Sequence, residues 1–487
     1  MNSISRRQPS FIVSLIPLVV LIAGLISIVV FLGADAVQRI SHGVLLIAAA
    51  VSTGIALLYC RRPMRAMVTG MRKSATQILP TLPILLMIAT VAATWMLSGV
   101  VPTLISYGLR LLEPKAFLIT TCATCAVISV LSGSSWTTIA TIGVAFMGIG
   151  TVWGYNPAWT AGAIISGAYF GDKVSPLSDT TVLASSACGV NLFTHIRYLM
   201  WTSVPAMVVA LIVFGIAGFF TDINTGAQSN LMIGQLSQIF NLTPWCLIIP
   251  AATVALIVLR LNTALTLAIS TVMGIIGIFL FQPSVLSALE ATTNPTFITH
   301  VATVVKLLLT ETSLSTGSEL LDSLVSTGGM EGMLPTIYLI LSAMIFGGAL
   351  MGSGMLSTIT HSVTRRLRKS SSTVMSTVGT GLMLNACTGD QYLSIILNGN
   401  LYRNLYRRNG LEPRLLSRSI EDSTSVTSVL IPWNSCGLTQ SAVLGVATLH
   451  YLPYCIFNLA SPLFTLVFAW VGFRIRSVTH RPVPVSR

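Results

Sequence analysis

The sequence predicts an all-α polytopic membrane protein built from two inverted-topology repeats. Of the 487 residues, 53% are hydrophobic and only 8% are charged, whereas an ordinary soluble domain carries about 25% charged residues. The mean hydropathy is +0.82. Apolar runs long enough to span a bilayer recur from one end of the chain to the other, and one set of residues recurs in both halves.

The apolar segments set the number of crossings. A spanning helix needs about 20 apolar residues, so with loops the chain has room for roughly ten to twelve crossings. Several segments are short or interrupted, and the sequence leaves open whether 101–112, 283–310 and 391–402 cross the membrane or turn back within it. The candidate spans are roughly 11–32, 41–59, 78–99, 116–131, 137–153, 158–171, 198–220, 244–260, 262–282, 334–357, 373–388, 424–447 and 451–473.

Charge indicates how the chain is oriented. Arg6 and Arg7 precede an apolar run over 11–32, which is longer than the apolar part of a signal peptide (about 7–15 residues), so we interpret it as a retained helix. Because basic loops stay in the cytoplasm, both termini are expected there. The net charge of +13 lies in short runs between apolar segments and does not indicate a nucleic-acid partner. These basic runs are 61–73, 365–369, 403–418 and the tail 475–487.

The eight cysteines do not predict redox chemistry. Cys122 and Cys125 form a CxxC pair, but inside the apolar stretch LITTCATCAVIS. A thioredoxin-type pair needs a βαβ context, so we expect small residues packed on one helix face.

Residues of the first half recur in the second at a nearly constant offset, which is the signature of a repeat. LPT at 79–81 recurs at 334–336, an offset of 255. Further matches at 255 or 256 pair Ser98-Gly99 with Ser353-Gly354, Arg110 with Arg365, Gly133 with Gly389, Trp136 with Tyr392, and Gly143 with Gly399. The predicted division is N-terminal helices (1–60), repeat 1 (61–221), connecting transmembrane and amphipathic segments (222–314), repeat 2 (315–474) and a basic cytoplasmic tail (475–487).

The charges before the two copies predict opposite orientations. The stretch before the first LPT is basic, whereas the stretch before the second is acidic and has no lysine or arginine after Lys306. Inverted repeats are typical of secondary transporters, whose sites lie near the bilayer midplane on discontinuous helices.

Polar residues gather in two places in each copy. The first is LSGSSWTT (131–138) and NACTGDQY (385–392). The second is GDKVSPLSDTT (171–181) and EDSTSVTSVLIPWN (421–434), a looser match in which Asp179 meets Asp422 at an offset of 243.

Such residues at membrane depth need a special setting. A charged residue there costs at least about 2.5 kcal/mol, and irregular backbone is tolerated only where it is buried or lines a wet cavity. Pro176 interrupts the helix and Gly167 and Gly171 are expected to loosen it. We therefore predict broken helices or re-entrant hairpins that meet near the midplane.

Freed carbonyl, hydroxyl and carboxylate oxygens at such breaks can surround a small cation. The primary candidates are Asp172 and Asp179, with Asp390 as a further Na+ ligand and Asp422 as its companion in the second copy. A buried carboxylate that titrates near cytoplasmic pH holds either a proton or Na+, and this competition gives exchange if only loaded states reorient. No cofactor is expected beyond Na+ and H+ as transported or coupling ions. The other candidate ligands are Ser134, Ser135, Ser175, Ser178, Thr180, Ser423 and Asn434.

These motifs resemble those of the NhaC-type Na+/H+ antiporter family, within the ion-transporter superfamily, over most of the chain. The sequence departs from the family at 398–399, where Asn-Gly replaces Pro-Gly, and at 423–428, where a glycine is expected. The resemblance implies an antiporter of Na+ or Li+ for H+, working by alternating access in the bacterial cytoplasmic (inner) membrane. The segments that carry the resemblance are SGSSWTTIATIGVAFMGIG (132–150), SGAYFGDKVSPLSDTT (166–181), GDQYLSIILNGNLYRNLY (389–406), the basic connector 407–418 and EDSTSVTSVLIPWNSCG (421–437).

Other functions stay open. Members of this family also exchange organic acids or amino-acid-like compounds. The alternative is therefore a cation-coupled exchanger of small organic acids or amino acids, such as malate or lactate, with Lys173 contacting the anionic substrate. An intramembrane aspartyl protease needs G-x-G-D, and both YFGD (169–172) and CTGD (387–390) lack the first glycine, so no enzyme is expected. A channel is disfavoured because the chain carries its own repeated pair. The stoichiometry is left open, as is whether the protein forms a homodimer.

Each candidate also has a purely structural interpretation. Asp172 and Lys173 can end a helix at the membrane surface, where lysine snorkels. Asp179 and Asp390 can cap the helices that follow them, and the serines of SGSSW can pack helices together. His195, near the end of a span, is expected at the surface.

Overall fold

The computed structural model describes residues 8–33, 36–221, 227–259, 261–289, 296–311, 322, 326–364, 367 and 369–475. Arg6, Arg7, Arg365 and the tail over 476–487 lie outside the described residues, so the expectations placed on them have no structural counterpart here. Within the described ranges the chain is helical throughout and has no β-strand, which confirms the predicted all-α class.

The helices follow one another in four groups. The N-terminal group is α1 (Phe11–Leu32) and α2 (Ala36–Leu58). The first half then contains α3 (Met64–Ile78), η1 (Leu79–Thr81), α4 (Leu82–Leu97), α5 (Val100–Leu111), η2 (Pro114–Ala116), α6 (Phe117–Ser132), α7 (Ser135–Thr138), the π-helical turn η3 (Ile139–Gly143), α8 (Val144–Val152), α9 (Pro157–Val174), α10 (Asp179–Cys188) and α11 (Leu192–Phe220).

The connecting group comprises α12 (Ala227–Ile239), η4 (Pro244–Leu247), α13 (Ile248–Val258), α14 (Thr263–Phe281), α15 (Pro283–Leu289) and α16 (Phe297–Leu309). The second half contains η5 (Glu331–Met333), α18 (Leu334–Ser353), α19 (Met355–Thr364), α20 (Ser370–Thr388), α21 (Gln391–Arg408), α22 (Pro413–Ile420), the π-helical turn η6 (Glu421–Ser425), η7 (Ser428–Leu430), α23 (Ser435–Leu444), α24 (Thr448–Tyr451), η8 (Leu452–Tyr454) and α25 (Ile456–Val471).

Many of these helices are long and apolar enough to cross a membrane. Eight qualify among the described residues, or ten if each of two bent pairs is one span; these pairs bend by 89° between Ile239 and Pro244 and by 59° at Cys455. Of the segments left open by the sequence, 101–112 falls in the 12-residue helix α5, and 391–402 lies inside the polar helix α21.

The basic run over 61–73 was expected to form a loop. Instead, from Met64 onward it is the start of a continuous 34-residue helical span over Met64–Leu97. Its first part, α3, keeps Arg65 and Arg72 exposed and packs its other face on α18. The two backbones meet at glycines, because a Cβ atom on Gly70 would lie 2.4 Å from the carbonyl oxygen of Gly348. Small residues permit such close crossings in membranes.

The same order of helices appears in both halves at an offset of 255–256 residues. It is marked by glycines with left-handed backbone, which pair as 99 with 354, 133 with 389, 154 with 410, and 189 with 445. Helix α9 then corresponds to the stretch beginning at Pro413, and α10 to α23. The offset of 243 proposed for Asp179 and Asp422 is therefore wrong: Asp179 corresponds to Ser435.

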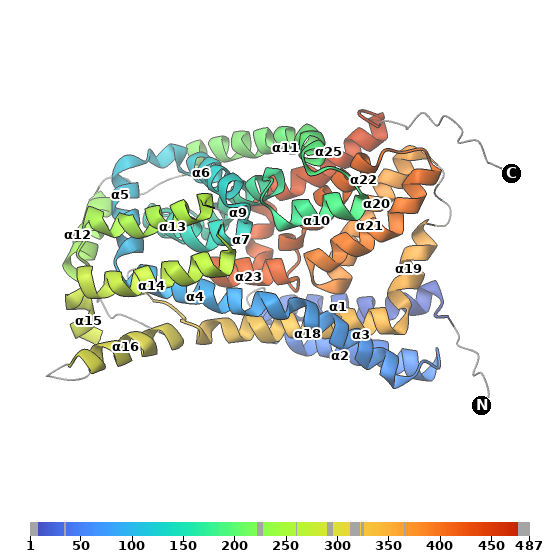
Figure 1. Ribbon diagram of the computed structural model, residues 1–487, viewed down its shortest axis with the longest axis horizontal. Coiled ribbons are helices and arrows are strands. Elements are labelled where there is room, and N and C mark those ends of the chain that lie inside the picture. Colours follow the sequence, from blue (N-terminus) through green and yellow to red (C-terminus); the bar gives the residue numbers. More distant parts are fainter. Residues whose placement is uncertain are drawn as a thin grey trace.

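Figure 1 shows the relative direction of the first helices of the two halves. Helix α4 leads from the end of the molecule that holds α3 and α19 toward the end that holds α5, whereas α18 leads from the side of α16 back toward α19. The two helices thus run in opposite directions, as the first helices of an inverted pair must.

Candidate functional site

Two helix breaks of the same design stand at corresponding places in the halves. After α6, Gly133 adopts a left-handed φ of 65° and Ser134 is extended; the Ser134 hydroxyl then accepts the Thr137 amide at 3.2 Å. After α20, Gly389 has a φ of 67° and Asp390 accepts the Leu393 amide at 2.8 Å. Each break ends one helix at a glycine and caps the next with a polar side chain.

A second pair of breaks separates α9 from α10 and η7 from α23. Residues 175–178 leave the helix, and the Ser178 hydroxyl caps α10 by accepting the Thr181 amide at 3.4 Å. Residues 431–434 do the same, and Asn434 caps α23 by accepting the Cys436 amide at 3.1 Å. Pro176 and Pro432 are each the second residue of a break, and the interruption predicted at Pro176 is observed.

The glycines before the first break have a different role from the one expected. Helix α9 stays regular through Gly167 and Gly171 and ends only at Val174. A Cβ atom on Gly167 would lie 2.1 Å from the Cys122 carbonyl oxygen, and one on Gly171 would lie 2.4 Å from that of Ala126. These glycines let α9 press against α6 rather than loosening the helix.

Residues at or next to three of these four breaks line a cavity of about 370 Å³. Four of the predicted residues line it, namely Ser134, Asp172, Asp179 and Thr180. The other polar groups of its wall are Thr81, Ser132, Thr137, Asn262, Thr263, Thr266, Gln391 and Tyr392. Because Asp179 is exposed and Asp172 is partly buried, this space offers two carboxylates to an entering cation.

Asp172 is held in place by the neighbouring break. The Ser135 hydroxyl donates to Asp172 Oδ2 at 2.7 Å and the Ser135 amide donates to the same oxygen at 3.2 Å. Asp179 is the first residue of α10 and not its cap, since Ser178 fills that position. The capping alternative considered for Asp179 therefore does not apply.

Asp390 lies behind the cavity wall. It is 4% exposed, caps α21 and accepts a long hydrogen bond of 3.5 Å from the Ser435 hydroxyl. The following residues, Gln391 and Tyr392, reach the cavity instead. The capping role considered for Asp390 is thus observed.

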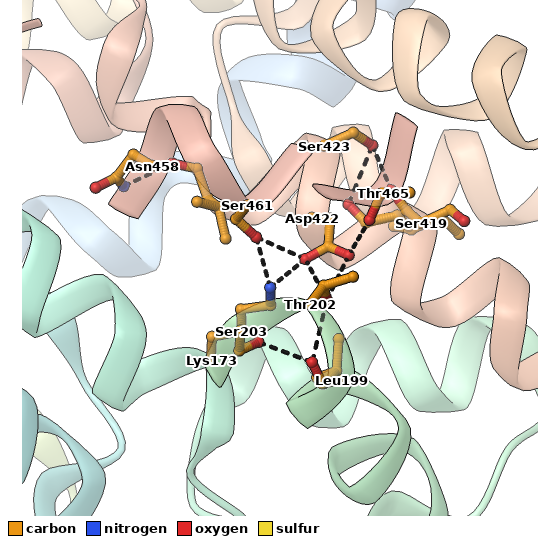
Figure 2. A network of polar contacts seen from close by, with 12 residues as sticks. Lys173, Leu199, Thr202, Ser203, Ser419, Asp422, Ser423, Asn458, Ser461 and Thr465 are labelled. Atoms are coloured by element: carbon orange, nitrogen blue, oxygen red, sulfur yellow. Dashed lines mark hydrogen bonds and ion pairs between the residues drawn. The ribbon is translucent and has the colours of Figure 1, made fainter. Parts of the chain in front are cut away.

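Lys173 and Asp422 form a buried ion pair away from the cavity (Figure 2). Ser461 donates to Asp422 Oδ1 at 2.7 Å, while Thr202 and Thr465 donate to Oδ2 at 3.0 and 2.5 Å. Lys173 also donates to the Ser461 hydroxyl at 2.8 Å. With a cation and three hydroxyl groups around it, Asp422 neutralises Lys173 and has no oxygen left to offer to a transported ion.

The remaining predicted ligands make other hydrogen bonds, and the Ser178 hydroxyl also lies 3.0 Å from that of Thr180. The Ser175 hydroxyl donates to the Val130 carbonyl at 2.8 Å, and the Ser423 hydroxyl to the Ser419 carbonyl at 2.6 Å. Ser178 and Asn434 act as helix caps. The structure therefore does not bring these four side chains into the wall of the cavity.

The sequence did not predict the burial of three ionisable residues. Glu421 and Arg418 are fully buried although both carry ionisable groups. Glu421 precedes Asp422 in the polar segment EDSTS (421–425), and this position in a polar cluster could have indicated a buried site. His195 is also fully buried rather than at the surface, and its Nδ1 lies 2.8 Å from the Ser417 hydroxyl.

Comparison with known proteins shows the family of the chain. The profile of the Na+/H+ antiporter family matches residues 6–187 and 167–473. The chain is similar to the Na+/H+ antiporter NhaC of Alkalihalophilus pseudofirmus, with 36% identity over 80% of this chain and 82% of that protein. NhaC of Bacillus subtilis is 33% identical over 80% of this chain and 83% of the relative. The malate-2H+/Na+-lactate antiporter of Bacillus subtilis is 32% identical over 87% of both chains. The chain belongs to the Na+/H+ antiporter family.

Proposed function

We propose that this protein is a secondary active antiporter that exchanges Na+ or Li+ for H+ across the bacterial cytoplasmic membrane. The observation that carries the proposal is the cavity between the helix breaks, with Asp172 and Asp179 in its wall. Hard cations prefer carboxylate, carbonyl and hydroxyl oxygens. The breaks supply all three kinds of oxygen at a place that broken helices of transporters use for ions.

The cation site is built from both copies of the repeat. Asp172 and Asp179 provide negative charge, and Ser134 and Thr180 add hydroxyl groups from the same wall. Gln391 and Tyr392, from the other half of the chain, close the opposite side. Movement of one half against the other would open this space to alternate sides of the membrane, with repeat 1 at 61–221 and repeat 2 at 315–474 in inverted orientation and both termini in the cytoplasm.

The test uses purified protein in liposomes that contain a trapped pH-sensitive dye and carry an imposed pH gradient. Na+, Li+ and K+ are added outside in separate runs. We expect Na+ or Li+ to collapse the gradient in the wild type and to have no effect in Asp172→Asn or Asp179→Asn. Glu113→Gln is the control, because Glu113 is an exposed carboxylate outside the cavity. Folded wild-type protein that responds to none of the cations would contradict the proposal.

A second candidate function has its own observation. The cavity of about 370 Å³ is far larger than one ion needs and lies in the range of small-molecule sites, about 300–1,000 Å³. Amide, hydroxyl and aromatic groups in its wall suit an organic acid or amino acid exchanged together with Na+. Lys173 would not contact this substrate, because Asp422 already binds it. Thermal shifts with malate, lactate and amino acids, with and without Na+, separate this candidate from simple exchange.

A further inference from the structure

Glu421 is a fully buried carboxylate that makes no hydrogen bond of normal geometry among the described residues, although the Ser425 hydroxyl lies near enough to act on it. It is 0% exposed, and neither Oε1 nor Oε2 has a hydrogen-bond partner among the described residues. Its neighbour Asp422 is just as buried but accepts hydrogen bonds from Lys173 and three hydroxyl groups. An ionised carboxylate without partners is so costly in a protein interior that the group takes up a proton instead. Burial without such partners therefore favours the protonated form of Glu421.

We propose that Glu421 is the proton-binding site of the exchange cycle, separate from the cation site at Asp172 and Asp179. The inference rests on the proposed antiport function and names the group that holds the proton. In this scheme H+ and Na+ do not compete for the same carboxylates. They bind at two separate sites, and occupation of one site changes the affinity of the other.

The local backbone suits such a site. Glu421 opens the π-helical turn η6, and π-helical turns are frequent at functional sites. The Thr424 and Ser425 hydroxyls in the same turn are buried and also lack hydrogen-bond partners among the described residues. Buried polar groups of this kind are commonly joined by water, which would pass a proton to and from the carboxyl group.

Several ionisable side chains lie on the elements around Glu421. Lys173 and Asp172 of α9 and Cys188 of α10 interact electrostatically with it, and Asp422 follows it in the chain. Helix α10 also carries Asp179, α25 carries no ionisable residue, and α20 carries only the thiol of Cys387. The ionisable residues of α21 are Tyr392, Tyr402, Arg403, Tyr406, Arg407 and Arg408.

Arg418, one turn before Glu421, is a second buried ionisable residue of this segment. It is fully buried, its guanidinium nitrogens have no hydrogen-bond partner among the described residues, and its charge lies 4.8 Å from the centre of the Tyr198 ring. Arginine keeps its charge in proteins, whereas glutamic acid can release its proton. When Glu421 gives its proton to water, the Lys173 ammonium is the positive charge that acts on the carboxylate.

The ion pair couples the two sites. Asp172 precedes Lys173, Glu421 precedes Asp422, and the pair joins the two segments. A cation bound at Asp172 removes the negative charge that acts on Glu421. In a low-dielectric interior this change favours loss of the proton. Cation binding thereby promotes proton release, which is the direction an antiporter requires.

The experiment compares wild type, Glu421→Gln and Glu412→Gln in proteoliposomes. Glu412 is a matched control, since it is paired with Arg414 near the surface. Two fluxes are measured: Na+-driven proton release and exchange of radioactive Na+ for unlabelled Na+. We expect Glu421→Gln to lose the first flux and keep the second, because Gln imitates the protonated acid. We expect Glu412→Gln to keep both fluxes.

Each other outcome has a definite meaning. A wild type without Na+-driven proton release refutes the proposed function itself, whatever the variants do. Proton release that persists in Glu421→Gln overturns the assignment of Glu421, and so does loss of both fluxes in folded protein. If Glu421→Gln does not fold, Glu421→Asp keeps an acid at the position. The infrared carbonyl band of a protonated carboxyl group must then shift relative to wild type, and an unshifted band overturns the inference.

Discussion

Lys173 and Asp422 lie 249 residues apart in the sequence and form a buried ion pair that ties α9 to the π-helical turn η6. Their side chains are 1% and 0% exposed. The pair joins two corresponding parts of the two halves, although neither residue corresponds to the other. It also separates two different carboxylates, Asp172 on the cavity side and Glu421 in the interior.

Breaking this pair should destabilise the protein strongly. Lys173→Met leaves Asp422 as a buried charge with hydroxyl partners only, and such losses cost about 3–5 kcal/mol. The thermal unfolding midpoint of the purified protein should therefore fall, and Lys173→Met combined with Asp422→Leu should recover part of the loss.

Arg414→Ala is the matched control, because its pair with Glu412 is partly exposed and surface pairs contribute about 0–1 kcal/mol. A Lys173→Met protein that unfolds at the wild-type temperature would mean that this charge is not buried in the folded protein.

Removing the Ser135 hydroxyl should weaken cation binding without unfolding the protein. It donates to Asp172 at 2.7 Å, and hydrogen bonds to charged groups contribute about 1.5–3 kcal/mol. Without it the carboxylate is less firmly oriented, so the Na+ concentration for half-maximal exchange should rise in Ser135→Ala while Ser135→Thr keeps a hydroxyl.

The comparison variant is Ser129→Ala, whose hydroxyl donates to the Ala168 carbonyl and only joins α6 to α9. Equal Na+ dependence of Ser135→Ala and wild type would show that the bond does not position Asp172 for the cation.

A methyl group on Gly167 should separate α6 from α9. The added Cβ atom would lie 2.1 Å from the Cys122 carbonyl oxygen, and overpacking typically costs about 1–3 kcal/mol. Gly167→Ala should thus lower the unfolding temperature.

Gly379→Ala offers the opposite expectation within another helix. Nothing lies within 4 Å of a Cβ atom there, so the higher helix propensity of alanine, about 1 kcal/mol, should leave stability unchanged or raised. The packing argument fails if both variants behave alike.

The proposed inverted orientation of the two halves predicts the side of the membrane on which each half begins. Arg65 and Glu331 lie at the start of the first span of their respective halves, and both are exposed. In intact cells a membrane-impermeant thiol reagent should label Glu331→Cys but should reach Arg65→Cys only after permeabilisation.

The native cysteines suit this experiment because all eight are buried. Arg407→Cys, in the last turn of α21, serves as a second cytoplasmic marker and should behave like Arg65→Cys. Labelling of Arg65→Cys and Glu331→Cys from the same side would exclude inversion of the repeats.

Helix ends were predictable from the sequence wherever local chemistry decides them. Gly133, Gly389 and Pro176 mark breaks because each restricts or releases the backbone at its own position. The composition was likewise enough to predict a membrane protein, because a chain with only 8% charged residues has too few of them to cover the surface of a soluble fold.

The partners of the charged residues were not predictable. Asp172 and Lys173 are neighbours in the sequence, but successive residues of an α-helix point about 100° apart. One therefore lines the cavity while the other meets Asp422. Matching polar clusters by residue type paired Asp179 with Asp422, whereas the helix order pairs Asp179 with Ser435. Tertiary packing alone reveals that Glu421 is left without a partner.

The distance of Lys173 from Asp422 along the chain has a consequence for biosynthesis. Ribosomes add about 5–20 residues per second, so the 249 residues between them take on the order of 12–50 s to make. During that interval the nascent chain has its lysine but not its counter-ion. The packing of Lys173 in α9 can therefore be completed only after Asp422 has been synthesised, and the first half on its own would hold this lysine without its counter-ion.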